Sequence, residues 1–152
     1  MPQVSSVVNV AAEPRVVYQA AQDVEGLAEF IDALESISVV ERIERPEGPE
    51  TVTSWIGKIP EFNRQIKWTE RDWWNDTDLT CRFTLVDGDL DKYDGTWAFE
   101  PGADGGCVCT LVVEYEYDVP LIGPLIKGLV FKKMQASVDA TQAGLKARAE
   151  AG

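Results

Sequence analysis

The sequence predicts an α+β fold in which a curved antiparallel sheet of about six to seven strands wraps around one long C-terminal helix. Three observations support this prediction. Short runs of alternating apolar and polar residues follow one another from residue 35 to residue 119. The links between them are short and rich in turn residues, which favours antiparallel neighbours because a parallel crossover needs about a dozen residues. From Pro124 onward, apolar residues recur at helical spacing.

The first part of the chain reads as a strand, two short helices and a second strand. Gln3–Val10 is a β-prone run, and Pro14 stands where a helix can begin. Gly26 interrupts the helical pattern, so we expect it to separate the two helices. Residues 35–44 alternate, with Val39 among the side chains expected to face the core, and the run RPEGPE then predicts a turn.

Four or five more strands follow, within residues 51–58, 64–74, 78–86, 90–101 and 107–119. Because side chains alternate across a strand, each run has one face expected to point inward. That face is rich in aromatic residues, namely Trp55, Trp68, Phe83, Tyr93, Trp97, Phe99, Tyr115 and Tyr117. Such a set is typical of a packed core, but it equally suits the wall of a cavity for a flat apolar ligand.

The C-terminal helix has one apolar stripe, formed by Ile126, Val130, Met134, Val138, Thr141 and Leu145. Five basic residues against Asp139 and Glu150 make the segment from Lys127 locally basic. A single helix does not easily fill the hollow of a curled sheet. We therefore expect a cavity between the two, with Val130 and Met134 on the helix side.

Composition predicts one folded domain spanning residues 1–152. Of the 152 residues, 45% are hydrophobic and 26% charged, which is ordinary for a globular protein, and no repeat or flexible linker divides the chain. The opening MPQVSSVVNV has neither the basic start nor the apolar run of a signal peptide. Together with three cysteines, an odd number, this predicts a cytoplasmic protein with reduced thiols.

The charge and the absence of histidine exclude several classes of function. A net charge of −12 repels phosphate backbones, so we expect no nucleic-acid partner. The chain has no histidine, which removes Ser-His-Asp and Cys-His catalysis and the commonest metal ligand. Acid–base chemistry would fall to Asp, Glu, Tyr, Lys or Cys.

Several short motifs, taken in order, resemble a known family. These are the segment from residue 11 to residue 42, with Pro14 at its first helix, Trp68 in a central strand, GTWAFEP at residues 95–101, and LVVEYEYDVP before the long helix. Over nearly its whole length the chain resembles the polyketide cyclase/dehydrase and lipid-transport proteins of the START-like (SRPBCC, helix-grip) superfamily.

The resemblance implies a helix-grip fold with a deep hydrophobic cavity between sheet and C-terminal helix. Some relatives cyclise or dehydrate polyketide chains held on a carrier protein, and others bind or move apolar molecules. Two hypotheses follow. The chain binds a small hydrophobic ligand, such as a lipid, a quinone or a polyketide-like molecule. Alternatively, it is an aromatase/cyclase or dehydratase that acts on a polyketide carried by an acyl carrier protein. Neither hypothesis requires a cofactor.

Glu70 is the best candidate for a catalytic residue. Its strand parity places it on the inner face beside Trp68, where burial would raise its pKa into the range of a general acid or base. It could instead reach water near the strand end or pair with a basic residue. Tyr93, Tyr115 and Tyr117 could each donate a hydrogen bond to a ligand carbonyl, or serve only as core residues.

Two patterns that suggest metal binding fail on inspection. Cys107 and Cys109 form a C-x-C pair, but only Cys81 remains as a further thiol, so buried core thiols are expected. The acidic run DGDLDKYDGTWAFEP starts at Asp87, and a calcium loop would need Gly at its sixth position and Glu at its twelfth. Those positions hold Lys and Ala, so we expect residues 87–89 to form a hairpin turn and predict no metal site.

The longest apolar segment, Val119–Phe131, is interrupted by two prolines, two glycines and a lysine. It is too short and too broken to span a bilayer. It could form a portal flap with at most transient membrane contact, or the buried start of the last helix.

Overall fold

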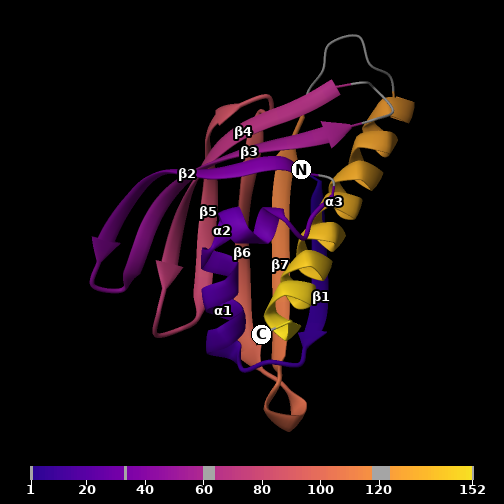
Figure 1. Cartoon of the computed structure of the whole chain (residues 1–152). Helices are drawn as coiled ribbons and strands as arrows, with labels where there is room; N and C mark the ends of the chain where they lie inside the picture. Colours follow the sequence, from indigo (N-terminus) through magenta and orange to yellow (C-terminus); the bar gives the residue numbers. More distant parts are fainter. Residues whose placement is uncertain (1, 33, 60–63, 118–123, 152) are drawn as a thin grey trace.

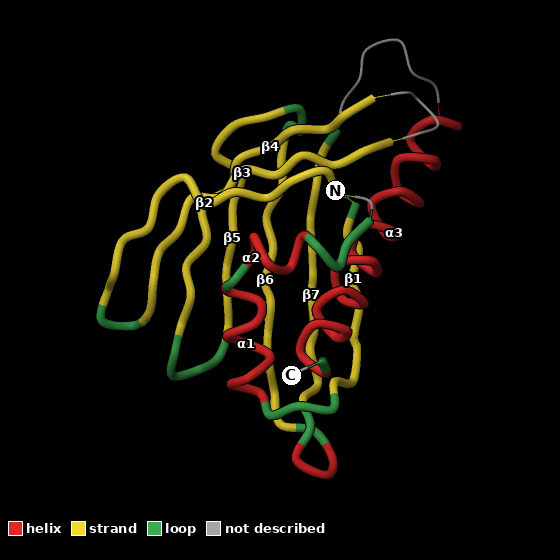
Figure 2. The backbone as a smooth tube through the Cα atoms, in the orientation of Figure 1, coloured by secondary structure: helices red, strands yellow, loops and turns green. Residues whose placement is uncertain are grey.

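The computed structural model describes residues 2–32, 34–59, 64–117 and 124–151. Figures 1 and 2 show their path. The elements in chain order are β1 (Gln3–Val10), α1 (Pro14–Gln22), α2 (Val24–Ala28), β2 (Leu34–Arg45), β3 (Gly48–Ile59), β4 (Arg64–Asn75), β5 (Thr80–Gly88), β6 (Lys92–Pro101), η2 (Ala103–Gly105), β7 (Cys107–Glu116) and α3 (Pro124–Glu150).

The described strands form one seven-stranded sheet in the order β1-β7-β6-β5-β4-β3-β2. Every pair of neighbours is antiparallel, and the first strand lies beside the last. The sheet is curved, and all three α-helices lie on one face of it (Figure 1). This arrangement confirms the predicted helix-grip architecture. None of the described helices is both long and apolar enough to cross a membrane.

The sequence predicted that the two short helices are separated at Gly26, but the structure has the break at Asp23. Asp23 ends α1 and begins α2, and its carboxylate accepts a hydrogen bond from the Gly26 amide. Gly26 lies inside α2, and the guanidinium of Arg148 lies 1.9 Å from where a Cβ atom would be at this position. The glycine therefore marks a close approach of α3 and not a helix end.

Strand β2 departs from simple alternation. Its pairing with β3 shifts register between Leu34 and Ser36, and again between Val39 and Glu41. Each shift changes which side chains face inward. Val39 is 38% exposed, contrary to the prediction, although it is in register with buried Ile37 and precedes the second shift. It lies on β2, an edge strand of the described sheet. The turn that follows is also tighter than expected, since β3 already begins at Gly48.

The hairpin between β5 and β6 turns later than residues 87–89. Asp87 and Gly88 still belong to β5, where they pair with Thr69 and Trp68 of β4. Gly88 has φ +141, and a Cβ atom there would lie 2.5 Å from the Trp68 Cα, so glycine is needed at this crossing. The chain then turns through residues 89–91 and buries Leu90.

The second half of α3 is packed firmly onto the sheet. Val138 and Leu145 are buried, and α3 packs against β1, β7 and α1. Gln142 is fully buried and polar. Its amide nitrogen donates to the carbonyl oxygens of Ser6 (3.0 Å) and Cys109 (2.9 Å), and its Oε1 accepts from the Trp97 indole (2.9 Å). These bonds satisfy the buried amide and join α3 to the first strand, β1, and to the last strand, β7.

Candidate ligand cavity

Two adjoining chambers lie between the sheet and α3. The outer chamber has a volume of about 320 Å³ and lies between β3, β4 and the first half of α3. Its lining consists of Leu34, Gly57, Lys58, Ile66, Trp68, Leu90, Tyr93, Tyr117, Val130, Lys133, Met134, Ala136, Ser137 and Ala140. Apart from two lysines, one serine and two tyrosine hydroxyls, these side chains are apolar.

The inner chamber is much smaller, at about 30 Å³. That is close to the volume of one liquid water molecule. Its lining consists of Val24, Leu34, Trp55, Trp68, Glu70, Asp72, Trp74, Cys81, Phe83, Tyr93, Trp97, Leu111, Ser137, Val138 and Thr141. Four residues line both chambers, namely Leu34, Trp68, Tyr93 and Ser137, so these side chains lie where the two chambers adjoin.

Aromatic rings in contact with one another form a wall where the two chambers adjoin. Trp55 and Trp68 are stacked, with centroids 5.6 Å apart and an interplanar angle of 11°. Trp68 then contacts Tyr93 at 5.3 Å, and Tyr93 contacts Phe83 at 5.7 Å. These rings come from β3, β4, β5 and β6. Their side chains share the concave face because the pairing between β3 and β4 keeps its register through this region.

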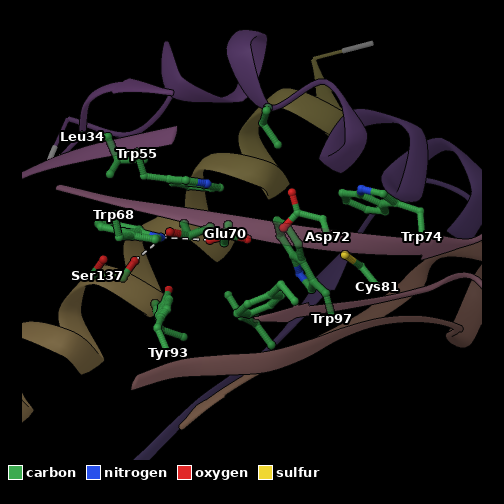
Figure 3. A pocket seen from close by; sticks show the side chains of 15 residues that line it. Leu34, Trp55, Trp68, Glu70, Asp72, Trp74, Cys81, Tyr93, Trp97 and Ser137 are labelled. Atoms are coloured by element: carbon green, nitrogen blue, oxygen red, sulfur yellow. Dashed lines mark hydrogen bonds between the residues drawn. The ribbon is translucent and has the colours of Figure 1, made fainter. Parts of the chain in front are cut away.

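The polar feature of the inner chamber is a pair of carboxyl groups on β4, Glu70 and Asp72. They are 5% and 3% exposed. Figure 3 shows them side by side in the middle of the cluster, with Trp55 and Trp68 on one side and Cys81 and Trp97 on the other. The two residues are separated by one position in the strand, so both point to the same face.

Each carboxyl group has defined hydrogen-bond donors. The Trp68 indole donates to Glu70 Oε1 at 2.9 Å. The hydroxyls of Thr51 and Thr53 donate to Asp72 Oδ2 at 3.0 and 2.9 Å. No Lys or Arg is among the described residues that line the inner chamber, so these carboxyl groups have no cationic partner there.

Burial raises the pKa of both carboxyl groups, and most strongly that of Glu70. For Glu70, the adjacent Asp72 charge raises the pKa further, and the Trp68 hydrogen bond opposes the rise only in part. For Asp72, the neighbouring Glu70 carboxyl group and the hydrogen bonds from Thr53 and Thr51 counteract the effect of burial on the pKa. We therefore assign the proton of the pair to Glu70.

The other predicted cavity residues divide between the two chambers. Trp55, Phe83 and Trp97 line only the inner one. Tyr117, Val130 and Met134 line only the outer one. Trp68 and Tyr93 line both, whereas Tyr115 is buried but lines neither.

Four further residues line the cavity but were not among the residues predicted from the sequence. Asp72 could have been predicted, because strand alternation puts it on the same face as Glu70. Leu90 was missed because its hairpin turn was expected earlier in the chain. Lys58 and Lys133 were missed because nothing in a local pattern brings a β3 residue opposite an α3 residue.

The thiols are buried within the fold. Burial raises the pKa of Cys81 well above its ordinary value and that of Cys109 to about 12, so neither is a thiolate at neutral pH. Within the part of the chain that the structure describes, no group of three or more His, Cys, Asp or Glu residues is arranged to hold a metal ion. Much of the apolar segment Val119–Phe131, proposed as a portal or membrane contact, lies outside the described residues.

The chain matches one family model and is similar to several solved structures. Residues 10–141 match the family model described as polyketide cyclase/dehydrase and lipid transport. The crystal structure of TTHA0849 from Thermus thermophilus has 35% sequence identity to the chain and a TM-score of 0.89, over 99% of this chain and 98% of that one. No curated protein matches the chain.

Two more distant structures share the fold. The Zhui aromatase/cyclase from a Streptomyces species is 16% identical with a TM-score of 0.75, over 98% of this chain and 93% of that one. A STAR-related lipid transfer protein from Xanthomonas axonopodis is 13% identical with a TM-score of 0.75, over 95% and 84% of the two chains. At these identities the likeness concerns the fold alone.

Proposed function

The chain belongs to the polyketide cyclase/dehydrase and lipid transport family, and on this premise we propose that it binds a small hydrophobic ligand in the outer chamber. A lipid, a quinone or a polyketide-like molecule has the required character. The observation that supports this most directly is the outer chamber itself, about 320 Å³ of space between apolar side chains of the sheet and α3.

The size of the outer chamber argues against a packing defect. Protein interiors are packed as densely as organic crystals, and their voids are rarely larger than one water molecule. A volume of about 320 Å³ lies instead at the lower end of the range for small-molecule pockets, about 300–1,000 Å³. The facing residues Gly57, Ser137 and Ala140 are too small to fill this space.

Filling the chamber with a larger side chain tests the proposal. Wild-type protein should bind the neutral fluorescent probe N-phenyl-1-naphthylamine, with enhanced emission. Met134→Trp should weaken this binding at least tenfold, because the indole occupies the chamber. Phe131→Trp is the matched control, since Phe131 lies on the same helix but is 42% exposed and does not line the chamber. Equal binding by wild type and Met134→Trp would contradict the proposal.

A second candidate function is acid catalysis on a polyketide-like substrate held by an acyl carrier protein. The buried pair of Glu70 and Asp72 favours it, because a protonated carboxyl group in an apolar site is a suitable general acid. Glu70 would donate its proton to a substrate carbonyl or to a departing hydroxyl group, and Asp72 would orient it. With about 30 Å³ in the inner chamber, only the end of a substrate in the outer chamber could reach Glu70.

Glu70→Gln separates the two candidates. The amide keeps the shape of the side chain but cannot transfer a proton, so turnover of a carrier-bound polyketide should be lost while probe binding is retained. Glu50→Gln is the control, since Glu50 is also buried but pairs with Arg45 and Arg71 outside both chambers. Unchanged turnover in Glu70→Gln would remove Glu70 from any mechanism.

A further inference from the structure

Two side-chain hydroxyl groups belong to residues that line both chambers, Tyr93 on β6 and Ser137 on α3. Neither hydroxyl hydrogen bonds to any residue that the structure describes. In the described part of the chain, no buried side-chain nitrogen or oxygen that is closed off from open space lacks a partner. The hydroxyls of Tyr93 and Ser137 are therefore open to the cavity, and a molecule that enters it can hydrogen bond to them.

These two groups differ from the rest of the inner lining. The other indole, hydroxyl and thiol groups of the inner chamber already donate to acceptors of the protein, and they belong to Trp55, Trp68, Trp74, Cys81, Trp97 and Thr141. Free hydrogen-bonding capacity among groups of this kind is thus concentrated where the two chambers adjoin.

The ring of Tyr93 is held in place by its neighbours. Its centroid lies 5.3 Å from that of Trp68 and 5.7 Å from that of Phe83. Figure 3 shows its hydroxyl pointing toward the side of the cluster where Trp68 and Glu70 lie. Burial, together with the nearby charges of Glu70 and Asp72, raises the pKa of Tyr93 well above its ordinary value. The hydroxyl therefore keeps its proton at neutral pH and remains a hydrogen-bond donor.

From this arrangement we propose that the cavity selects neutral apolar ligands that carry a carbonyl group, whose oxygen accepts hydrogen bonds from Tyr93 and Ser137. A carbonyl oxygen has two lone pairs and no proton, so it suits two hydroxyl donors that approach from the sheet and from the helix. The apolar remainder of the ligand occupies the outer chamber. The assignment rests on the proposed ligand-binding function and adds to it the polar group of the ligand and its orientation.

The carboxyl pair of the inner chamber favours a neutral acceptor over an anionic one. With the proton of the pair on Glu70, Asp72 carries a negative charge inside the chamber. That charge repels a carboxylate placed beside Tyr93, whereas a ketone or ester carbonyl meets no such repulsion. The same orientation brings the carbonyl to the edge of the inner chamber, where the second candidate function requires it.

Two ligands of nearly equal shape test the proposal. 1-Acetonaphthone and 1-ethylnaphthalene differ only by an oxygen atom in place of two hydrogens, and each can be titrated against bound N-phenyl-1-naphthylamine. Tyr93→Phe should lower the affinity for the ketone about fivefold, as expected for one neutral hydrogen bond, and Ser137→Ala should act in the same direction. The affinity of both variants for 1-ethylnaphthalene and for the probe should stay within about twofold of wild type, which also shows that the cavity is intact.

Tyr115→Phe is the matched control for Tyr93→Phe. Tyr115 is the cross-strand partner of Tyr93 on β7, is 3% exposed and lines neither chamber. Loss of its hydroxyl should leave the ratio of ketone to hydrocarbon affinity within about twofold of wild type. Infrared spectroscopy gives a second readout, since a hydrogen bond moves the carbonyl stretching band of the bound ketone to lower frequency, and Tyr93→Phe should reverse part of that shift.

The inference is overturned if Tyr93→Phe keeps the wild-type affinity ratio and band position, or if Tyr115→Phe lowers the ratio equally. In either case, displacement of the probe by 1-ethylnaphthalene would leave the proposed binding of apolar ligands standing. If neither ligand displaces the probe from the wild-type protein, the proposed ligand binding fails as well.

Discussion

The two halves of α3 face the same curved sheet but meet it differently. The second half packs against β1, β7 and α1, with Val138 and Leu145 buried. The first half faces β3 and β4 across the outer chamber, where Val130 and Met134 are only partly buried (Figure 1). The apolar stripe runs through both halves without interruption, so helix periodicity does not distinguish the packed region from the hollow one.

The difference depends on the residues that oppose the helix. Around the second half, Trp97 and Gln142 fill the space and bond to each other. Around the first half, Gly57 on β3 faces Ser137 and Ala140 on α3, and all three are small. The cavity therefore exists because small residues, which lie far apart in the sequence, leave the space between sheet and helix unfilled. Three changes of volume or charge test this comparison.

Truncating an apolar residue should have the largest effect in the packed half. Leu145→Ala should lower the free energy of unfolding by about 3 kcal/mol, because Leu145 is fully buried and its removal leaves a new cavity. Met134→Ala should cost less than about 1 kcal/mol, since its side chain already borders open space. Urea denaturation measures both values. Similar losses for the two variants would mean that the halves are equally packed.

Adding volume should also cost more stability in the packed region than beside the chamber, with an intermediate effect. Ala21→Leu should destabilise the fold by about 1–3 kcal/mol, because Ala21 is fully buried in the core. Ala140→Leu should change stability by less than about 0.5 kcal/mol, since the added carbon atoms extend into the outer chamber. Thermal unfolding at one pH compares them. An equal loss from Ala140→Leu would show that the chamber cannot accept another side chain.

The third comparison concerns the charge of Glu70 in the inner chamber. The folded state raises the pKa of Glu70 above 4.5, so it keeps a proton that the unfolded chain releases. This adds stability that is fully present below about pH 4.5 and is lost as pH rises through the pKa of folded Glu70. Gln at position 70 has no such dependence.

Stability measured between pH 5 and pH 7 should therefore fall faster in wild type than in Glu70→Gln. The difference in slope should approach about 1.4 kcal/mol per pH unit, corresponding to one proton, at pH values below the pKa of folded Glu70. Denaturant titrations at several pH values give both slopes. Parallel pH profiles would indicate that Glu70 is ionised in the folded protein, and would count against its role as a general acid.

Sequence patterns predicted the fold and one face of each strand, but not the interior volume. Alternation located Trp68 and Glu70 correctly because β4 keeps its register with β3 through them. It failed at Val39, which is in register with buried Ile37 but is exposed on the edge strand β2. It also placed Tyr115 on the inward face without indicating that this side chain lines neither chamber. The position of a residue along a strand determines which face of the sheet it lies on. Whether it also lines a cavity depends on the side chains that oppose it, which come from distant segments of the chain.

The pairing of β1 with β7 has a consequence for how the protein is made. The paired residues, such as Val4 with Val113, are about a hundred positions apart in the chain. At a synthesis rate of about 5–20 residues per second, β1 leaves the ribosome about 5–20 s before its partner strand exists. Val4 and Val10, which are buried in the finished sheet, must stay uncovered for that time. This nascent segment is where a chaperone would have most to protect.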